Sequence, residues 1–483
     1  MSSSTVLIKC LRNVNLCSDS HKNYKISILQ NLINKNQHLA PQGSKEWLDM
    51  RVFNIGGSEM ATITGDNGFS TMEQLVAQKV GLRNFTGNRA TRWGKLFEHI
   101  TDDLTKIMLE ITDDMGIFET GSLEGAVANQ RYSPDGLAIV KLKCAITIGG
   151  EKIETDEYCI VLFEYKSPFS SIPTGTIPKY YLPQVKTGLC SIPITDLAIF
   201  VNNMYRKCSL DMFDFTERYN IEFHDGDVKK KVKPTNPIAM GIIMVYQTDI
   251  QRSKFQERYS NKIADYDSDD SDDSDDPGSV FRHIEENKTN VNTSNIYSRI
   301  FHHKDLIDFG ESGGHDFEIM LQLYDDGLLS TKFYEPCVFR SEYHRIPILV
   351  AQEKSQVNIR PIVDMIQSQR NNIHSFKELS NKTWHPIGYL PWKMFKSSMI
   401  FQERDDTYVQ RYNEKIQDVI QTIRDLGGLS NNLNETALKF DAKFPNNKIT
   451  QIFKESQPEH IMSMLPQGIH DSDDSDDSDD SEY

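Results

Sequence analysis

A carboxylate and an ammonium group stand two positions apart in residues 160–166 (IVLFEYK), a segment that is otherwise apolar. Side chains two apart on a β-strand project from the same face, so Glu164 and Lys166 are expected to point out of this strand together. Burying such a pair is costly unless something compensates for it, and a bound metal ion would do so. Asp135, in the earlier segment 133–136 (SPDG), would supply a second hard oxygen ligand. The combination fits phosphodiester hydrolysis with one or two Mg²⁺ ions on carboxylate oxygens, while the lysine orients the nucleophile or stabilises developing charge.

The same pattern also has an ordinary structural explanation. Asp135 and Gly136 could form a common turn, and Glu164 and Lys166 could form a salt bridge across strands. For an arbitrary protein this explanation would be favoured, so the surrounding segments must decide between the two.

Helices and strands alternate around these residues. A capping box of Thr71 with Gln74 predicts one helix, and apolar periodicity predicts a longer one over 88–110. Strands are predicted at 117–119, 126–132, 137–144, 158–166 and 196–202, with a helix around 179–190 before the last of them. This order predicts an α/β or α+β fold in which helices flank one central mixed sheet.

The composition limits the class of protein. A chain of 483 residues predicts roughly two to four domains and enough apolar material for a packed core. No run approaches the ~18 apolar residues of a membrane helix, and residues 1–15 lack the pattern of a secretory signal. Seven cysteines without CxxC spacing disfavour a disulfide framework, a zinc ribbon and an iron–sulfur site. We therefore expect an intracellular protein that is neither secreted nor bound to a membrane.

Two acidic tracts account for the net charge of −16. Residues 265–276 and 471–482 repeat the unit DSDD; each tract holds eight acidic residues and neither contains Lys or Arg. Without them the chain has 53 acidic and 53 basic residues, so a face that binds nucleic acid is allowed. Both tracts are predicted to be solvated and disordered. A solubilising role is favoured over mimicry of a polyanion or phosphorylation of the serines.

Several sequence motifs around the predicted site, which follow one another in a fixed order along the chain, decide between the two explanations. In chain order they are WLDMR at 47–51, IGGSE at 55–59, RWGKLFE at 92–98, SPDGL at 133–137, EYKSP at 164–168, YYLPQV at 180–185 and DLAIF at 196–200. The set resembles the lambda-exonuclease-like, YqaJ-type branch of the PD-(D/E)XK nuclease superfamily, which includes recombinases of large DNA viruses. The resemblance covers residues 44–203 and implies a restriction-endonuclease-like core.

The resemblance also implies catalytic and metal-binding roles. Asp135 and Glu164 would be the central metal ligands, joined by Glu98 and by the backbone carbonyl of Tyr165. Lys166 would be the catalytic lysine. Outside the family, Glu98 would more readily be a solvated helix residue.

Further matching residues imply contacts with DNA. Arg51, Ser58 and Ser133 would hold a 5′-terminal phosphate, since a guanidinium forks onto phosphate oxygens and hydroxyls complete the shell. Gln184 would lie near the active site and contact the metal-bound water or DNA. Alternatively, Arg51 could form a local salt bridge, Ser58 could be a helix cap and Gln184 could be a surface residue.

The resemblance divides the chain into a core and additions. The interval between Asp135 and Glu164 is longer than in the family, so residues 141–157 are predicted to form an extended hairpin. The predicted parts are a helical extension at 1–40, the nuclease core at 41–205, an insertion at 206–380 with an acidic linker at 265–278, the C-terminal part of the core at 381–428 with an amphipathic helix at 406–426, and a polar tail at 429–483.

The implied function is a Mg²⁺- or Mn²⁺-dependent DNA exonuclease. It would act 5′→3′ on duplex ends through a metal-activated water and produce single strands for annealing and recombination. A structure-specific endonuclease on the same fold, and an inactive DNA-binding or virion protein, are the alternatives. The expected partners are double-stranded DNA ends, a single-strand annealing protein and further copies of the chain in a ring. A virally encoded chain would be found in the host-cell replication compartment or the virion.

Overall fold

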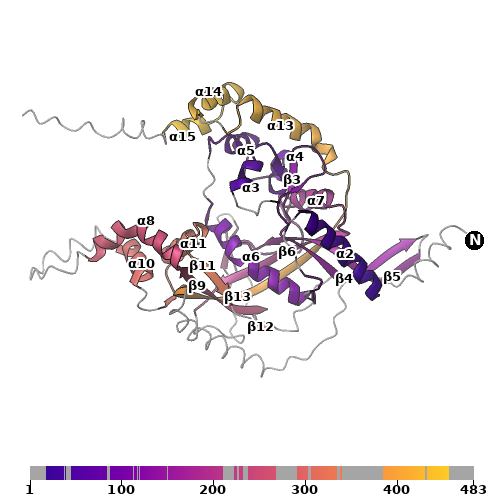
Figure 1. The fold of residues 1–483 in the computed structure, drawn as a ribbon, viewed down its shortest axis with the longest axis horizontal. Helices are drawn as coiled ribbons and strands as arrows, with labels where there is room; N and C mark the ends of the chain where they lie inside the picture. The colour runs from indigo at the N-terminus through magenta and orange to yellow at the C-terminus, as the bar shows by residue number, and fades with distance from the viewer. Residues whose placement is uncertain are drawn as a thin grey trace, which may run out of the picture.

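A computed structural model gives the fold of the chain (Figure 1). It describes residues 18–36, 39, 45–83, 87–112, 114–116, 118, 120–148, 151–209, 222–225, 228–231, 238–267, 291–302, 306–333, 338–339, 384–429 and 432–455. Except for residues 265–267, which end a helix, the two acidic tracts lie outside these ranges, as do residues 1–17 of the predicted N-terminal extension.

One large mixed sheet forms the centre of the molecule. Its strands run in the order β11-β9-β13-β6-β5-β4. Their bounds are β4 (Gly136–Ile148), β5 (Glu151–Lys166), β6 (Leu197–Lys207), β9 (Ala239–Thr248), β11 (Ser330–Phe333) and β13 (Trp384–Glu403). Strands β5 and β6 are parallel, whereas the other neighbours in this order are antiparallel. Two short strands join the sheet as well, β10 (Ile307–Asp308) on β13 and β12 (Val338–Phe339) on β9. The prediction of a central mixed sheet flanked by helices is confirmed.

The two faces of β5 are covered by different helices. Ile160 and Leu162 pack among residues of α2 (Asp19–Asn36) and α7 (Leu182–Ser191), whereas Val161 and Phe163 pack on the other face with Met108 of α6 (Arg89–Met108). This alternation follows from the two-residue period of a strand. The predicted hairpin between Asp135 and Glu164 is present as the β4–β5 pair, which extends beyond the body of the sheet (Figure 1).

Helix α6 joins the first half of the chain to the later strands. Asn88 caps its N-terminus, and its aromatic residues lie in the core that it shares with β6 and β13. Phe97 stacks on Tyr205 with ring centroids 4.4 Å apart, and Trp392 meets both rings edge-on. Helices α8 (Asp249–Asp267), α10 (Val291–His302) and α11 (Gly314–Asp325) belong to the same side of the molecule as β9 and β11 (Figure 1).

A smaller unit of helices packs away from the sheet, with α13 and α14 above α5 in Figure 1. It shares one apolar cluster that includes Val76, Ile420 and Phe440. The predicted capping box of Thr71 with Gln74 is confirmed. The unit contains α3 (Lys45–Met50), η1 (Gly57–Glu59), α4 (Met60–Thr64), α5 (Met72–Lys79), η4 (Gln410–Tyr412), α13 (Asn413–Asp425), α14 (Leu433–Lys443) and α15 (Ile449–Glu455).

Several elements differ from the expected ones. The strand expected at 126–132 is reduced to β3 (Gln130–Tyr132), which lies between β1 (Ile55–Gly56) and β2 (Leu123–Glu124). The helix expected at 406–426 begins only at α13, and the segment predicted to be a polar tail contains α14 and α15. Strands β9 and β11, from the predicted insertion, lie in the central sheet, and a separate pair, β7 (Glu222–Asp225) and β8 (Val228–Lys231), precedes them. The division of the chain into domains stays a proposal.

Helix α7 approaches the sheet closely because it carries a glycine at the contact. A Cβ atom on Gly188 would lie 2.4 Å from the Tyr132 ring and 2.6 Å from a methyl group of Leu162. Such separations are far below van der Waals contact, so any side chain here would displace its neighbours.

We expect Gly188→Ala to lower the free energy of unfolding by about 1–3 kcal/mol, because the added methyl group overpacks the contact. Urea denaturation measures the change. Gly94→Ala is the matched control, since Gly94 lies inside α6 and no neighbour within the described part of the chain comes within 4 Å of the place its Cβ atom would take. Alanine there should stabilise by about 0.5–1 kcal/mol. Equal stability of Gly188→Ala and the wild-type protein would contradict the close packing of α7.

Candidate active site

Two carboxylates and one ammonium group meet where β4 and β5 pair. Glu164 is fully buried, and Lys166 Nζ donates a hydrogen bond to its Oε1. Asp135 Oδ2 accepts a hydrogen bond of 2.8 Å from the backbone N–H of Tyr165, which ties the start of β4 to the end of β5. Glu164 and Lys166 have the same strand parity as Leu162 and therefore lie on the face covered by α7. The structure thus brings together the three residues on which the predicted chemistry depends.

The surroundings of Asp135 disfavour its charged form. Burial raises the pKa of Asp135 well above its usual value, and the nearby charges of Glu164 and Glu98 raise it further, against the opposing effect of Lys166. For Lys166, burial alone would lower the pKa, but the carboxylates of Glu164 and Asp135 outweigh it and raise the pKa. The ammonium group therefore stays charged at neutral pH, and the two carboxylates still repel each other.

Tyr132 is a member of the site that the sequence analysis missed. Its hydroxyl donates a hydrogen bond of 2.8 Å to Glu164 Oε2, on the oxygen that Lys166 does not bind. Burial, followed by the charge of Glu164, raises the pKa of Tyr132 well above its usual value, so the hydroxyl stays protonated. Its ring lies between Gly57 and Gly188, where a Cβ atom on either glycine would lie 2.4 Å from a ring carbon. The available signal was its place directly before Ser133, at the end of a strand.

Glu98 lies close enough to Asp135 for its charge to act on that carboxyl group. It is half-buried on α6, a helix that packs on the other face of β5 through Met108, and its negative charge raises the pKa of Asp135. In the part of the chain that the structure describes, no three His, Cys, Asp or Glu side chains are grouped so that they could hold a metal ion. The neighbouring Asp102 accepts a hydrogen bond of 3.2 Å from the hydroxyl of Tyr165. A three-carboxylate metal site that includes Glu98 therefore stays a prediction.

Gln184 lies in the first turn of α7 and is half-buried. Its Cγ would lie 3.7 Å from a Cβ atom on Gly57, which places it beside η1. It therefore lies on the same face of the sheet as Glu164 and next to the turn that carries Ser58.

Arg51 belongs to a group of charges that is largely removed from solvent. Its guanidinium lies 2.7 Å from Glu59 Oε1, and Lys79 Nζ lies 2.7 Å from Glu59 Oε2. Burial alone would raise the pKa of Glu59, but the charges of Lys79 and Arg51 outweigh it and lower the pKa. Burial lowers the pKa of Lys79, and the positive charge of Arg51 lowers it further, against the opposing effect of Glu59. One negative charge thus faces two positive charges, and the alternative of a local salt bridge at Arg51 is confirmed.

Trp47 lies between Arg51 and Ser133. The Arg51 guanidinium lies 4.5 Å from the centre of the Trp47 ring, and the Trp47 indole N–H donates a hydrogen bond of 3.3 Å to Ser133 Oγ. Ser58 is exposed in η1, where Gly56 and not Ser58 is the cap. The structure therefore joins Arg51 and Ser133 through one ring, with the Ser58 hydroxyl open to solvent nearby.

We expect Glu59→Gln to lower the free energy of unfolding by about 3–5 kcal/mol at pH 7, because it leaves the buried Lys79 without its counter-charge. A carboxylate with a lowered pKa stabilises the fold above its unfolded pKa of about 4.3, and this contribution is lost as the pH falls through the folded pKa. The difference between variant and wild type should therefore be complete at pH 7 and shrink steadily below about pH 4. Urea denaturation across this pH range measures it.

Glu435→Gln is the matched control for this charge group, because Glu435 pairs with Lys439 at the surface. Its removal should change stability little at any pH. A deficit of Glu59→Gln that is independent of pH would contradict the assignment of the stabilisation to the ionised carboxylate.

Comparison with known proteins shows that the predicted site lies within a segment that matches one protein family. A family model described as the YqaJ-like viral recombinase domain matches residues 46–195, which contain every residue of the predicted site. A curated protein of African swine fever virus is 29% identical over 224 residues, which is 43% of this chain and 61% of that protein, and versions from another isolate and a strain match to the same extent. The chain thus spans less than two thirds of the length of the curated relatives it matches.

Two solved structures are similar to part of the chain. The crystal structure of an alkaline exonuclease (LHK-Exo) from Laribacter hongkongensis has a TM-score of 0.24 and 19% identity, and the match covers 33% of this chain and 74% of that chain. Its complex with dAMP has the same TM-score and covers 73% of that chain. The YqaJ-type resemblance that the sequence motifs predict is confirmed by the match of residues 46–195 to the model of the YqaJ-like viral recombinase domain.

Proposed function

We propose that the chain is a metal-dependent deoxyribonuclease that hydrolyses phosphodiester bonds as an exonuclease on duplex ends. The observation that supports this most is the group of Asp135, the buried Glu164 and Lys166 inside the segment that matches a recombinase domain. Two carboxylates with one ammonium group give a site that lacks positive charge, which is the arrangement that a divalent cation would complete.

The donor set suits Mg²⁺ or Mn²⁺. Both cations prefer oxygen ligands, and Asp135 and Glu164 would bind through their carboxylates, with the carbonyl of Tyr165 and the carboxylate of Glu98 as further oxygens. Such a cation supplies charge that polarises the phosphate and lowers the pKa of water. Burial and the charge of Glu164 raise the pKa of Asp135, which fits this assignment because a cation would stabilise the charged form of Asp135.

The side chains of the site have separate tasks in this proposal. Lys166, charged at neutral pH, orients the nucleophile or stabilises charge on the phosphate. Tyr132 fixes one oxygen of Glu164 so that the other is left to Lys166. Gln184 contacts the attacking water or DNA from α7.

End recognition would give the enzyme its direction. Arg51, Ser58 and Ser133 hold a 5′-terminal phosphate in this proposal, and hydrolysis then proceeds 5′→3′. The group of Arg51, Lys79 and Glu59 carries one excess positive charge, which favours an anion at this place. The single strands that remain would pass to an annealing protein, and a ring of several copies would keep the enzyme on DNA. Because the relatives are viral, we place this activity where viral DNA is replicated.

A structure-specific endonuclease on the same fold is the second candidate. Arg51 is already paired with Glu59, and an arginine used in this way has less capacity to hold a terminal phosphate. A binding protein without activity is the third, and the assembled Asp135, Glu164 and Lys166 disfavour it.

Linear and covalently closed circular duplexes, incubated with the purified chain and Mg²⁺, separate these candidates. We expect degradation of the linear DNA alone and loss of activity with EDTA. Asp135→Asn and Lys166→Ala should each lower kcat by about 10²–10³ or more, while the Kd for DNA changes little. The first removes an anionic ligand of the cation, and the second removes the positive charge beside the reacting phosphate. Lys439→Ala, a surface lysine paired with Glu435, is the control and should retain full activity. Nicked circles would favour the endonuclease, and uncut DNA of both kinds would contradict the nuclease.

Linear duplexes with 5′-phosphate and 5′-hydroxyl ends test the role of Arg51. The wild-type protein should prefer the phosphate by about 10–100-fold in kcat/KM, the value of a charge-assisted hydrogen bond, and Arg51→Ala should abolish this preference. Arg411→Ala, which likewise removes an arginine paired with a carboxylate, here that of Asp405, should retain it. An unchanged preference in Arg51→Ala would show that the phosphate is held elsewhere.

A further inference from the structure

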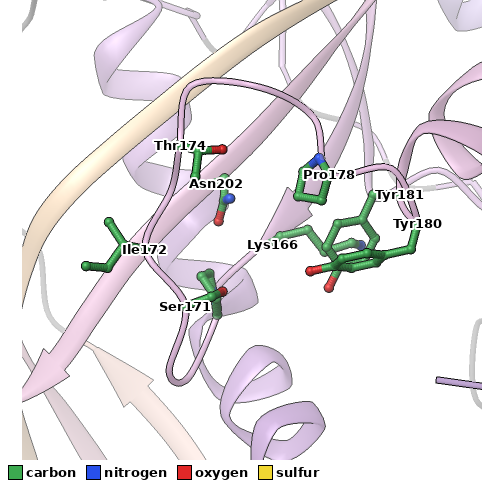
Figure 2. Close-up of a pocket in the computed structure, with 9 residues that line it drawn as sticks. Lys166, Ser171, Ile172, Thr174, Pro178, Tyr180, Tyr181 and Asn202 are labelled. Carbon is green, nitrogen blue, oxygen red and sulfur yellow. The ribbon is translucent and has the colours of Figure 1, made fainter. Parts of the chain in front are cut away.

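A cavity of about 240 Å³ opens beside Lys166 (Figure 2). It lies between the loop that follows β5 and the residues that lead into α7. The residues that line it are Lys166, Pro168, Ser171, Ile172, Thr174, Pro178, Tyr180, Tyr181 and Asn202. None of them is acidic, so the cavity is unsuited to a metal ion and its one charge is the ammonium group of Lys166.

Two neighbouring strands supply the polar part of the cavity. Lys166 of β5 pairs in parallel with Asn202 of β6, so both side chains leave the sheet on the same face. Asn202 is only 6% exposed, and its Oδ1 has no hydrogen-bond partner among the residues that the structure describes. A buried amide oxygen without a partner is costly. It therefore points to a ligand that donates a hydrogen bond inside the cavity.

Aromatic rings also line the cavity, next to Lys166. The rings of Tyr180 and Tyr181 have centroids 4.4 Å apart, and Lys166 Nζ lies 5.1 Å from the centre of the Tyr181 ring (Figure 2). Phe69 meets Tyr180 edge-on at 5.1 Å and is 77% exposed. An exposed phenylalanine beside a cavity extends the aromatic surface toward solvent, where a planar ligand would enter.

We propose that this cavity binds a nucleobase that adjoins the phosphate at Lys166. Tyrosine rings suit stacking with a base, and stacking accepts any base because every base has a π-face. The Asn202 amide can present its oxygen or, after rotation, its nitrogen to a base edge. The volume lies below the ~300–1,000 Å³ of sites for drug-sized molecules, which limits the occupant to one base. This inference rests on the proposed function, because it assumes that Lys166 faces a phosphate.

Binding of dAMP and of 2-deoxyribose 5-phosphate to the full chain tests the cavity without any cleavage. Titration calorimetry should show about tenfold tighter binding of dAMP by the wild-type protein, because only dAMP can stack. Tyr180→Ala should reduce this ratio to about one, whereas Tyr180→Phe, which keeps the ring, should preserve it. Equal affinity of the wild-type protein for the two compounds, or an undiminished ratio in Tyr180→Ala, would overturn the proposal.

A substitution at the surface gives a second test that remains valid if Tyr180→Ala does not fold. Phe69→Ala should lower the dAMP ratio by severalfold, while Ile250→Ala, which removes an apolar side chain of similar exposure on α8, should leave it unchanged. The same reduction in both would show a general surface effect and would contradict a base site.

Cleavage of duplexes that carry an abasic residue on either side of the first scissile phosphate identifies the source of the base. A loss of about tenfold in kcat/KM at one position shows that a base of the DNA docks in the cavity. Unchanged kcat/KM, together with weaker inhibition of Tyr180→Ala by dAMP, shows that the released mononucleotide docks there instead. A wild-type chain that cleaves no DNA would refute the proposed function, and the dAMP titration would still decide the base site.

Discussion

The repulsion between two carboxylates, one of them fully buried, beside a single ammonium group is the constraint on which the candidate site depends. Glu164 is fully buried with Asp135 and Lys166 half-buried beside it, and burial together with the charge of Glu164 raises the pKa of Asp135. Such a group would not be favoured for stability alone, because an apolar replacement of similar volume avoids the cost of removing charges from water. Its assembly is easier to explain as preparation for two ligands. A cation would balance the two carboxylates, and a phosphate would pair with the ammonium group of Lys166.

The segment that contains Tyr132 and Ser133 holds the parts of this site together. Tyr132 binds Glu164 of β5, Ser133 accepts a hydrogen bond from Trp47, and Asp135 accepts one from the backbone of Tyr165. One short stretch of chain therefore connects the carboxylates to the ring on which Arg51 lies. The glycines on either side of the Tyr132 ring allow α7 and η1 to approach, so a change at either glycine would disturb both the carboxylates and the predicted phosphate site.

The sequence predicted the local features well and the distant ones poorly. Alternation of polar and apolar residues placed Glu164 and Lys166 on one face, and the capping box at Thr71 marked the start of α5. Tyr132 and Asn202 were missed because neither lies in a pattern of spacing: each becomes part of the site only through a strand pairing that joins distant segments. Glu59 stood in a quoted motif, but its role depends on Lys79, which no periodicity connects to it.

The central position of β6 explains why the site needs more of the chain than the family match covers. The match ends at residue 195, directly before Asp196, whose carboxylate accepts a hydrogen bond from the backbone of Ile160. Strand β6 follows, with β5 on one side and β13 on the other. Because β13 comes from residues 384–403, Asn202 and the cavity beside Lys166 are held by a strand far along the sequence. A segment ending near residue 205 would leave β6 as an exposed edge, with the backbone groups that face β13 unpaired. The strands beyond the matched segment are therefore part of the structure that fixes Lys166, and a functional comparison with relatives must include them.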